Sequence, residues 1–210
     1  MLIALGPAVR EAPHAADARL VAEETMRRVA ANVDEVIRRL KSRGYRFRTP
    51  SGARIPPGVQ TAKLLRELDD LAGPVPFSLA AFYGIVGSID LTGYHDSITP
   101  NFGGYYLPDP LVVFPLDQVL REYHEATEAD FGRIVLAPDA YHKAELSGGA
   151  PYEVKLPDPC ADGKLLNERH DLYFVEYLRL AFRHAGFPGY DGMERLPGIV
   201  RILSLELQPF

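Results

Sequence analysis

The sequence predicts an α+β protein with a central, mostly antiparallel sheet of short strands flanked by helices and a long N-terminal helix. Three observations support this fold class. Apolar residues between positions 26 and 40 recur at the i, i+3, i+4, i+7 spacing of a helix face. Short apolar runs bounded by Gly or Pro lie between positions 88 and 156. The connections between these runs are often short, which favours antiparallel or mixed pairing over a doubly wound sheet.

The first 72 residues predict two helices separated by a loop. The long helix is expected over residues 15–43, and Gly44 is placed to end it. Prolines and glycines in residues 45–58 predict a loop, and a second helix is expected over residues 60–72. The apolar positions of the long helix are Met26, Val29, Ala30, Val33, Val36, Ile37 and Leu40, and those of the second helix are Leu64, Leu65, Leu68 and Leu71.

The middle of the chain predicts a helix, a strand and a long loop. Pro76 suits the first turn of a helix, so a helix is expected over residues 77–86, with Gly87 at its end. Its buried residues would be Leu79, Phe82, Tyr83 and Val86. A strand follows over residues 88–91. Residues 92–108 are rich in Gly and Tyr and predict an exposed loop whose length is typical of functional loops.

The second half alternates short strands and helices. Strands are expected over residues 111–114 and 134–137, and a half-exposed strand with alternating polarity over residues 152–156. Helices are expected from Pro115 to Tyr123 and over residues 172–185. Residues 196–207 fit either a strand or a helix, and Pro197 favours the helix because proline suits a helix start.

Composition places the chain among ordinary globular proteins. It has 210 residues, of which 47% are apolar and 24% charged. No run approaches the roughly 20 apolar residues that a membrane span needs, and no signal peptide is recognised, so a cytoplasmic protein without membrane contact is expected. Cys160 is the single cysteine, which excludes an internal disulfide and a cysteine-rich metal site.

Charge is distributed unevenly along the chain. Residues 1–105 hold 13 basic and 11 acidic residues, whereas residues 106–210 hold 10 and 17. Basic residues concentrate between Arg27 and Arg54. These arginines could face solvent, or pair with the acidic half within one molecule or across a dimer. The segment Tyr45-Arg46-Phe47-Arg48 interleaves aromatic and basic residues as nucleic-acid sites do, but the acidic balance argues against a nucleic-acid partner.

The motifs of common active sites are missing from the sequence. It has no phosphate-binding loop, no dinucleotide-binding glycine motif and no serine nucleophile elbow. No catalytic residue, metal or cofactor is therefore predicted. One alternative remains open, a small hydrolase whose site is assembled from His95, Asp96, His142 and His170. Cys160 is expected to be structural, since Asp158 and Asp162 would raise the pKa of its thiol.

A resemblance to a known family comes from the residues after Gly73. The stretch Pro74-Val75-Pro76-Phe77-Ser78-Leu79-Ala80-Ala81-Phe82-Tyr83, continued by Gly84-Ile85-Val86-Gly87-Ser88-Ile89-Asp90-Leu91-Thr92-Gly93, resembles the opening of the SUKH superfamily. The later runs 109–113 and 134–139 resemble its following strands. The resemblance covers roughly residues 73–185 and implies an α+β domain that binds and neutralises a protein toxin, without catalytic residues. It suggests a division into residues 1–58 and a SUKH-like domain over residues 59–210.

These observations together predict a non-catalytic binding protein of the immunity type, with a basic toxin domain as a possible partner. An acidic face steers association with a basic partner, and tyrosine is favoured at interfaces. Burial under the loop is the alternative for the tyrosines. The expected partner-binding residues are Tyr94, His95, Asp96, Tyr105, Tyr106, Glu122, Glu125, Glu128 and Asp130.

A regulatory or scaffold protein is the other alternative. The apolar stripe of helix 15–43 has to be buried against something, and a second copy of the chain would satisfy it. The sequence therefore leaves open a homodimer formed through this helix.

Overall fold

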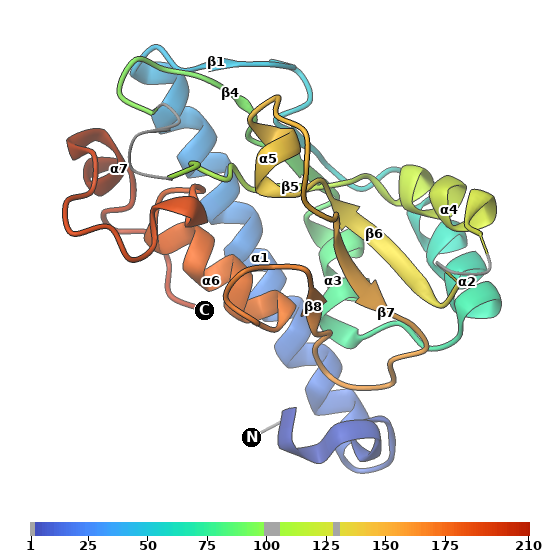
Figure 1. Ribbon diagram of the computed structural model, residues 1–210. Coiled ribbons are helices and arrows are strands. Elements are labelled where there is room, and N and C mark those ends of the chain that lie inside the picture. The colour runs from blue at the N-terminus through green and yellow to red at the C-terminus, as the bar shows by residue number, and fades with distance from the viewer. Residues whose placement is uncertain (1–2, 99–105, 128–130) are drawn as a thin grey trace.

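The computed structural model describes residues 3–98, 106–127 and 131–210, and it confirms an α+β fold (Figure 1). Helix α1 (His14–Ser42) runs along one side of the molecule, with α6 (Phe174–Arg183) in front of it in this view. The strands lie beside these helices, and α2 (Thr61–Ala72) and α4 (Leu116–Glu125) lie beyond the strands at the far edge. The termini of the described chain lie on the α1 side, away from α2 and α4.

Helix α1 confirms the predicted long helix and its buried stripe. The side chains of Met26, Val33 and Leu40 are fully buried, and the helix packs along α3 (Phe77–Ile85). The helix ends where predicted, because Gly44 adopts a left-handed backbone and Tyr45 N–H donates to the carbonyl of Leu40 at 3.0 Å. The stripe that could have supported a dimer is therefore covered within the molecule.

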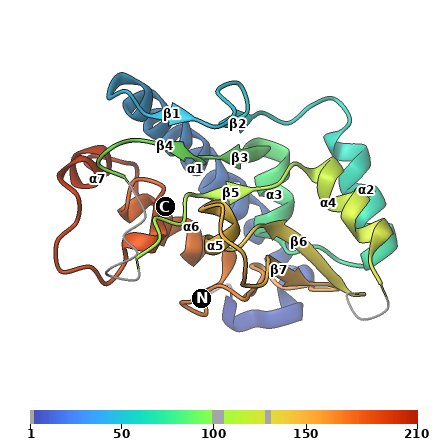
Figure 2. The same cartoon turned by 45° about the horizontal axis from the view of Figure 1, so that its top comes forward.

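All strand pairs among the described residues are antiparallel, but the predicted central sheet is divided into three small sheets (Figure 2). Their orders are β1-β4, β2-β3-β5 and β6-β7-β8. One backbone hydrogen bond of 2.7 Å, from Phe114 N–H to the carbonyl of Leu136, links the second sheet to the third. The strands are β1 (Arg46–Phe47), β2 (Arg54–Ile55), β3 (Ser88–Asp90), β4 (Gly93–Tyr94), β5 (Val112–Val113), β6 (Arg133–Ala137), β7 (Tyr152–Lys155) and β8 (Leu165–Leu166).

Three sequence predictions about strands and loops are wrong. The predicted loop 45–58 contains β1 and β2, and the predicted exposed loop 92–108 contains β4 and the buried Ile98. These strands are only two residues long and too short to show a period. The strand predicted over residues 152–156 is buried rather than half-exposed. Glu153 is 8% exposed because β7 lies between β6 and β8, and its carboxylate is covered by Arg133 and Asn167.

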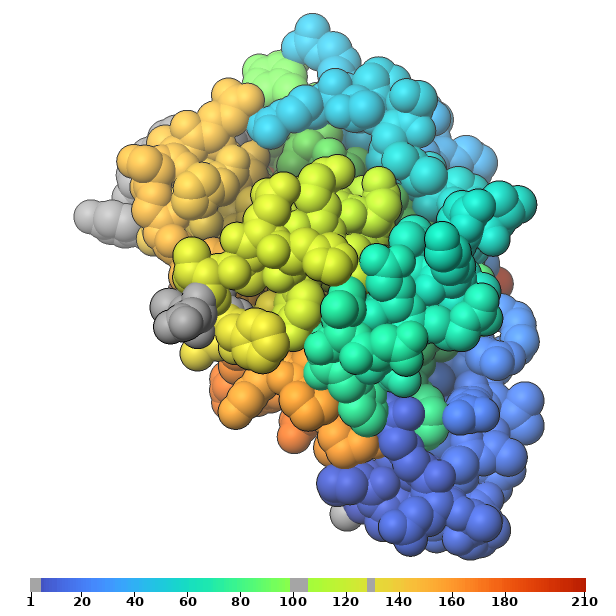
Figure 3. All heavy atoms as spheres, turned by 90° about the vertical axis from the view of Figure 1, so that its right-hand side faces the viewer, coloured from blue at the N-terminus to red at the C-terminus, as the bar shows by residue number. Residues whose placement is uncertain are grey.

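The remaining helices include five predicted ones and three short ones without a sequence signal. Helices α2, α3, α4, α6 and α7 (Gly198–Leu203) confirm the predictions, although Leu71 of the apolar side of α2 is exposed. Figure 3 shows α2 and α4 side by side on one face of the molecule. The unpredicted elements are the short helix α5 (Ala140–Lys143) and the 3-10 segments η1 (Ile3–Arg10) and η2 (Pro188–Tyr190).

One hydrophobic core joins α1 to the rest of the chain. Most buried residues of α1, α3, α6 and the strands form one large cluster, so residues 1–58 and 59–210 share it, and a small second cluster contains Val9, Ala18 and Phe77. The division suggested by the sequence stays a prediction. None of the helices in the described parts of the chain is long and apolar enough to cross a membrane.

The basic segment is neutralised mostly within α1 rather than by the acidic half. Arg27 and Arg28 pair with glutamates one turn earlier on the helix, and Arg38 and Arg39 both pair with Glu35. Arg54 lies on β2, after this helix, and pairs with Asp34 of α1. From this segment, Arg48 reaches the second half of the chain, where it pairs with Glu145.

Candidate functional site

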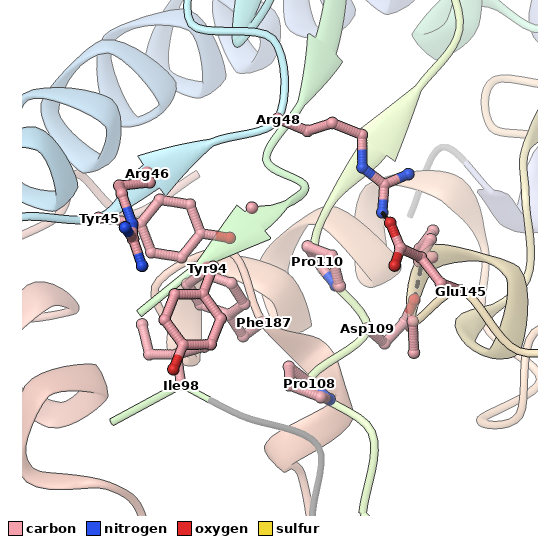
Figure 4. Close-up of a pocket in the computed structure, with 13 residues that line it drawn as sticks. Tyr45, Arg46, Arg48, Tyr94, Ile98, Pro108, Asp109, Pro110, Glu145 and Phe187 are labelled. Atoms are coloured by element: carbon pink, nitrogen blue, oxygen red, sulfur yellow. Dashed lines mark hydrogen bonds and ion pairs between the residues drawn. The ribbon is translucent and has the colours of Figure 1, made fainter. Parts of the chain in front are cut away.

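A cleft of about 340 Å³ lies between the β1–β4 pair and α5 (Figure 4). The guanidinium groups of Arg46 and Arg48 flank it, and the ring of Tyr94 lies at its mouth. Tyr45 and Phe187 contribute to its aromatic wall. The volume is within the range of small-ligand pockets, roughly 300–1,000 Å³.

The β1–β4 pair sets the position of the cleft mouth. Arg46 pairs with Tyr94 and Phe47 with Gly93, so the arginine and the tyrosine are cross-strand neighbours. The Arg46 guanidinium carbon lies 5.1 Å from the centroid of the Tyr94 ring, as in a cation–π contact. A Cβ atom at Gly93 would lie 2.3 Å from the carbonyl oxygen of Arg46, so the close approach of the strands requires glycine there.

Tyr94 is 46% exposed, which makes the burial alternative wrong for this tyrosine. Its hydroxyl donates to Asp96 Oδ1 at 2.8 Å. This hydrogen bond, together with the charge of Asp96, raises the pKa of Tyr94. The ring therefore stays a neutral phenol that presents an apolar face and a polar edge to a partner.

A buried ion pair forms the base of the cleft. Lys143 Nζ lies 2.6 Å from Asp109 Oδ1, and their side chains are 0% and 7% exposed. Tyr152 donates its hydroxyl to Asp109 Oδ2 at 3.0 Å. Burial first, and then the charge of Asp109, raises the pKa of Tyr152 well above its ordinary value. The two charges neutralise each other, so the base of the cleft is buried and polar but carries no net charge.

Helix α5 carries the lysine of this pair. Asp139 caps the helix by accepting the backbone N–H of Tyr141 at 2.8 Å, and it contacts His142 Nδ1. Burial alone would raise the pKa of Asp139, but the hydrogen bonds from His142 and the backbone amides lower it. The chain leaves the helix through Glu145, which has a φ of +61° and pairs with Arg48 at 3.0 Å.

A second cavity of about 210 Å³ shares Asp109 with the cleft. Asn167, Arg169 and Tyr141 are among the residues that line it. Asp109 and Asn167, like Glu145, have positive φ angles of +49° and +64°. Such backbone strain is concentrated at functional sites when surrounding contacts enforce it. These three positive-φ residues lie beside the buried charges, whereas others such as Glu206 lie elsewhere in the chain.

Comparison with models of known protein families, with curated proteins and with solved structures found no match. The resemblance to the SUKH superfamily therefore stays a prediction.

The structure separates the predicted partner-binding residues into two groups. Tyr94, His95 and Asp96 lie on β4 and the turn after it, whereas Glu122 and Glu125 lie on α4. Figures 1 and 2 both place β4 and α4 far apart on the molecule. Tyr106, the first described residue after position 105, is half-buried. The predicted residues Tyr105, Glu128 and Asp130 lie outside the described residues.

The two glutamates of α4 differ in accessibility. Glu122 is half-buried and accepts a hydrogen bond of 2.8 Å from the Gln118 side chain. Glu125 is exposed near the end of the helix. The acidic face is therefore smaller, over the described residues, than the sequence pattern indicates.

The residues of the hydrolase alternative have separate partners. His95 Nε2 contacts the carbonyl of Arg43 at 3.0 Å, His142 contacts Asp139, and His170 Nδ1 contacts Glu168 at 2.5 Å. The described residues hold no group of three His, Cys, Asp or Glu side chains arranged for a metal. At Cys160, burial first and then Asp158 raise the pKa of the thiol to about 11. A thiol with such a pKa is a poor nucleophile at neutral pH.

Sequence reasoning named Tyr94 but missed the base of the cleft. Asp109, Lys143 and Tyr152 lie on three separate elements or loops, and no spacing in the sequence links them. Lys143 was one charged residue among many, and its burial depends on the fold. The Tyr45–Arg48 segment, in which aromatic and basic residues alternate, is the sequence signal that points to this place.

Proposed function

We propose that this protein is a non-catalytic binding protein and that a protein partner docks on the mouth of the cleft. The observation that carries the proposal is Tyr94, which is half-exposed, contacts the Arg46 guanidinium of β1 and lies beside a preformed cavity. Tyrosine and arginine are enriched among the residues that dominate binding energy, and such residues lie around pockets that the partner fills.

The base of the cleft supports binding rather than catalysis. Asp109 is held by Lys143 and by the Tyr152 hydroxyl, so its carboxylate is engaged on both oxygens. Lys143 is fully buried and paired. A general acid or base has to reach the proton it transfers, whereas a buried, neutralised ion pair preserves the shape of a binding site.

The specific form of the proposal is an immunity protein that neutralises a toxin in the cytoplasm. The support for this form is the sequence resemblance of residues 73–93. Glu125 and the rest of the acidic half would add long-range steering of a basic toxin domain. The two separated surfaces would then have different roles, with the cleft holding the partner and the acidic residues speeding its approach.

The test is capture of the partner from lysate of the source organism with the tagged chain, compared between the wild type and Tyr94→Ala. We expect one stoichiometric partner that survives a high-salt wash on the wild type. Removal of Tyr94 is expected to accelerate its dissociation by at least about tenfold, since a central aromatic residue contributes on the order of 2 kcal/mol or more.

Phe131→Ala is the matched control, because Phe131 is also an exposed aromatic residue but lines neither of the two cavities. Dissociation from this variant should match the wild type. Equal dissociation from the wild type and Tyr94→Ala would overturn the proposed surface. A bait recovered without a partner, or only as its own oligomer, would favour the self-associating regulator instead.

A further inference from the structure

Two exposed arginines lie at the β1 edge of the cleft, Arg46 on the strand and Arg48 directly after it. Side chains alternate along a strand, and Arg46 and Arg48 are both exposed while Phe47 between them is buried. Figure 4 shows these two arginines on either side of the cleft, with the half-exposed Tyr94 near Arg46. Arginine pairs with carboxylates through two parallel hydrogen bonds, so two exposed arginines at one cleft suit a ligand that carries acidic groups.

The positive charge at the cleft is only partly compensated. Lys143 at the base is neutralised by Asp109. Arg48 is joined to Glu145 through one contact, Nη2 to Oε1 at 3.0 Å, rather than through a two-pronged pair. Across the described residues, no carboxylate lies within ion-pair distance of Arg46, whose guanidinium instead lies over Tyr94.

Glu145 holds its place because of the residues before it. Lys143 anchors α5 in the base of the cleft, and Glu145 follows two residues later with a left-handed backbone. Its side chain is 78% exposed, and it reaches across the cleft to an arginine that is 97 positions away in the sequence. Exposed ion pairs contribute little to stability, so this contact can be exchanged for another carboxylate at small cost.

We propose that the cleft recognises an acidic segment of the protein partner, and that Glu145 occupies the position of a partner carboxylate in the free protein. On binding, a partner carboxylate takes the Arg48 guanidinium from Glu145, and a second acidic group of the same segment pairs with Arg46. The exposed Tyr94 ring packs against the same segment. This inference rests on the proposed function and names the chemistry of the partner.

The experiment measures binding of a fluorescein-labelled peptide with four consecutive glutamates, flanked by Gly-Ser, by fluorescence anisotropy at low salt. The full chain is used as the wild type and as Glu145→Gln and Glu125→Gln. We expect Glu145→Gln to tighten binding about two- to fivefold, because an exposed competing ion pair is removed. Glu125→Gln removes the same charge from distant α4 and is expected to leave the dissociation constant unchanged.

Arg46→Gln and Arg48→Gln should each weaken the peptide about tenfold, and the matching four-glutamine peptide should not bind. All these side chains are exposed, so the variants are expected to keep the wild-type circular dichroism spectrum. If Glu145→Gln and Glu125→Gln change the dissociation constant of the peptide equally, the effect of Glu145 is only that of net charge, and the inference is overturned. Tighter binding of a uridine octanucleotide than of the acidic peptide would overturn it too, in favour of a nucleic-acid site.

Failure of this inference differs from failure of the proposed function. A partner could be captured through Tyr94 and yet dissociate from Glu145→Gln and Arg48→Gln at the wild-type rate. The cleft would then bind that protein without contacting the partner's carboxylates. The inference is then wrong and the proposed function holds. If the partner dissociates from Tyr94→Ala at the wild-type rate, the proposed function itself is wrong.

Discussion

Asp162 lies buried beside the first turn of α6. Ser78 donates its hydroxyl to Asp162 Oδ1 at 2.6 Å, and the backbone N–H of Val175 donates to Oδ2 at 3.1 Å. Burial raises the pKa of this carboxyl to about 6, although these hydrogen bonds partly oppose the rise. Asp162 thus caps α6 from the loop before β8. Ionisation of this buried carboxyl near neutral pH costs free energy.

The pH dependence of stability follows from this raised pKa. Between about pH 4 and pH 6 the native state holds a proton that the unfolded chain has released. The stability that this bound proton contributes is fully present below the pKa that Asp162 has in the unfolded chain. It is lost as the pH rises through about 6. The wild type should therefore lose stability between pH 4 and pH 7, whereas Asp162→Asn should not. We expect the difference in the free energy of unfolding to shift in favour of Asp162→Asn by up to about 3 kcal/mol from pH 4 to pH 7. Urea denaturation at both pH values measures this difference, and Asp70→Asn, an exposed aspartate, should show no such change.

The buried pair of Asp109 and Lys143 gives a second prediction for single residues. Lys143→Met leaves the Asp109 carboxylate buried with only the Tyr152 hydroxyl as a side-chain donor. We expect a loss of about 3–5 kcal/mol in the free energy of unfolding. The double variant Asp109→Asn with Lys143→Met should recover most of that loss, because no buried charge remains and asparagine tolerates the positive φ at this position. Additive losses in denaturant titrations would contradict this account.

Helix α1 shows how one element combines a buried face and an exposed face. Leu40 is fully buried in the stripe, whereas Leu20 on the same helix is 61% exposed. We expect Leu40→Ala to lower the free energy of unfolding by about 2–5 kcal/mol. Leu20→Ala should change it by less than about 0.5 kcal/mol. Denaturant titration of both variants checks the pair, and a large concentration-dependent effect of Leu20→Ala would instead reveal self-association through this exposed leucine.

The elements divide into those that sequence patterns predict and those that they do not. Helix α1 was predictable because its stripe repeats over many turns and Gly44 ends it. Strands β1 and β8 were not, since two residues cannot show a period. The cleft draws on five separate segments of the chain, so its position depends on packing between elements rather than on any local pattern. Tyr94 could be named from composition, but the pairing of Lys143 with Asp109 could not.

Over the whole molecule, the C-terminal tail is held against the N-terminal helix. Asn32 of α1 donates to the carbonyl of Gln208 at 2.9 Å and accepts its N–H at 2.8 Å. Arg28 donates to the carbonyl of Pro209, and Arg39 to that of Leu203. The basic residues of α1 therefore bind tail carbonyls as well as glutamates of their own helix, and they join parts of the chain that are distant in sequence.

Asn32 is the central contact in this arrangement, since it is buried and serves as both donor and acceptor for Gln208. We expect Asn32→Ala to leave these backbone groups without their partner, which costs about 1–3 kcal/mol of local stability. The Gln208 amide should then exchange with solvent at least about tenfold faster, as measured by hydrogen exchange. Carboxypeptidase should also trim the tail sooner. Arg27→Ala is the control, because Arg27 is exposed and pairs with Glu23 and Glu24 of its own helix. Equal exchange in both variants would show that the tail is held by its apolar contacts with the core, through Leu207 and Phe210, rather than by Asn32.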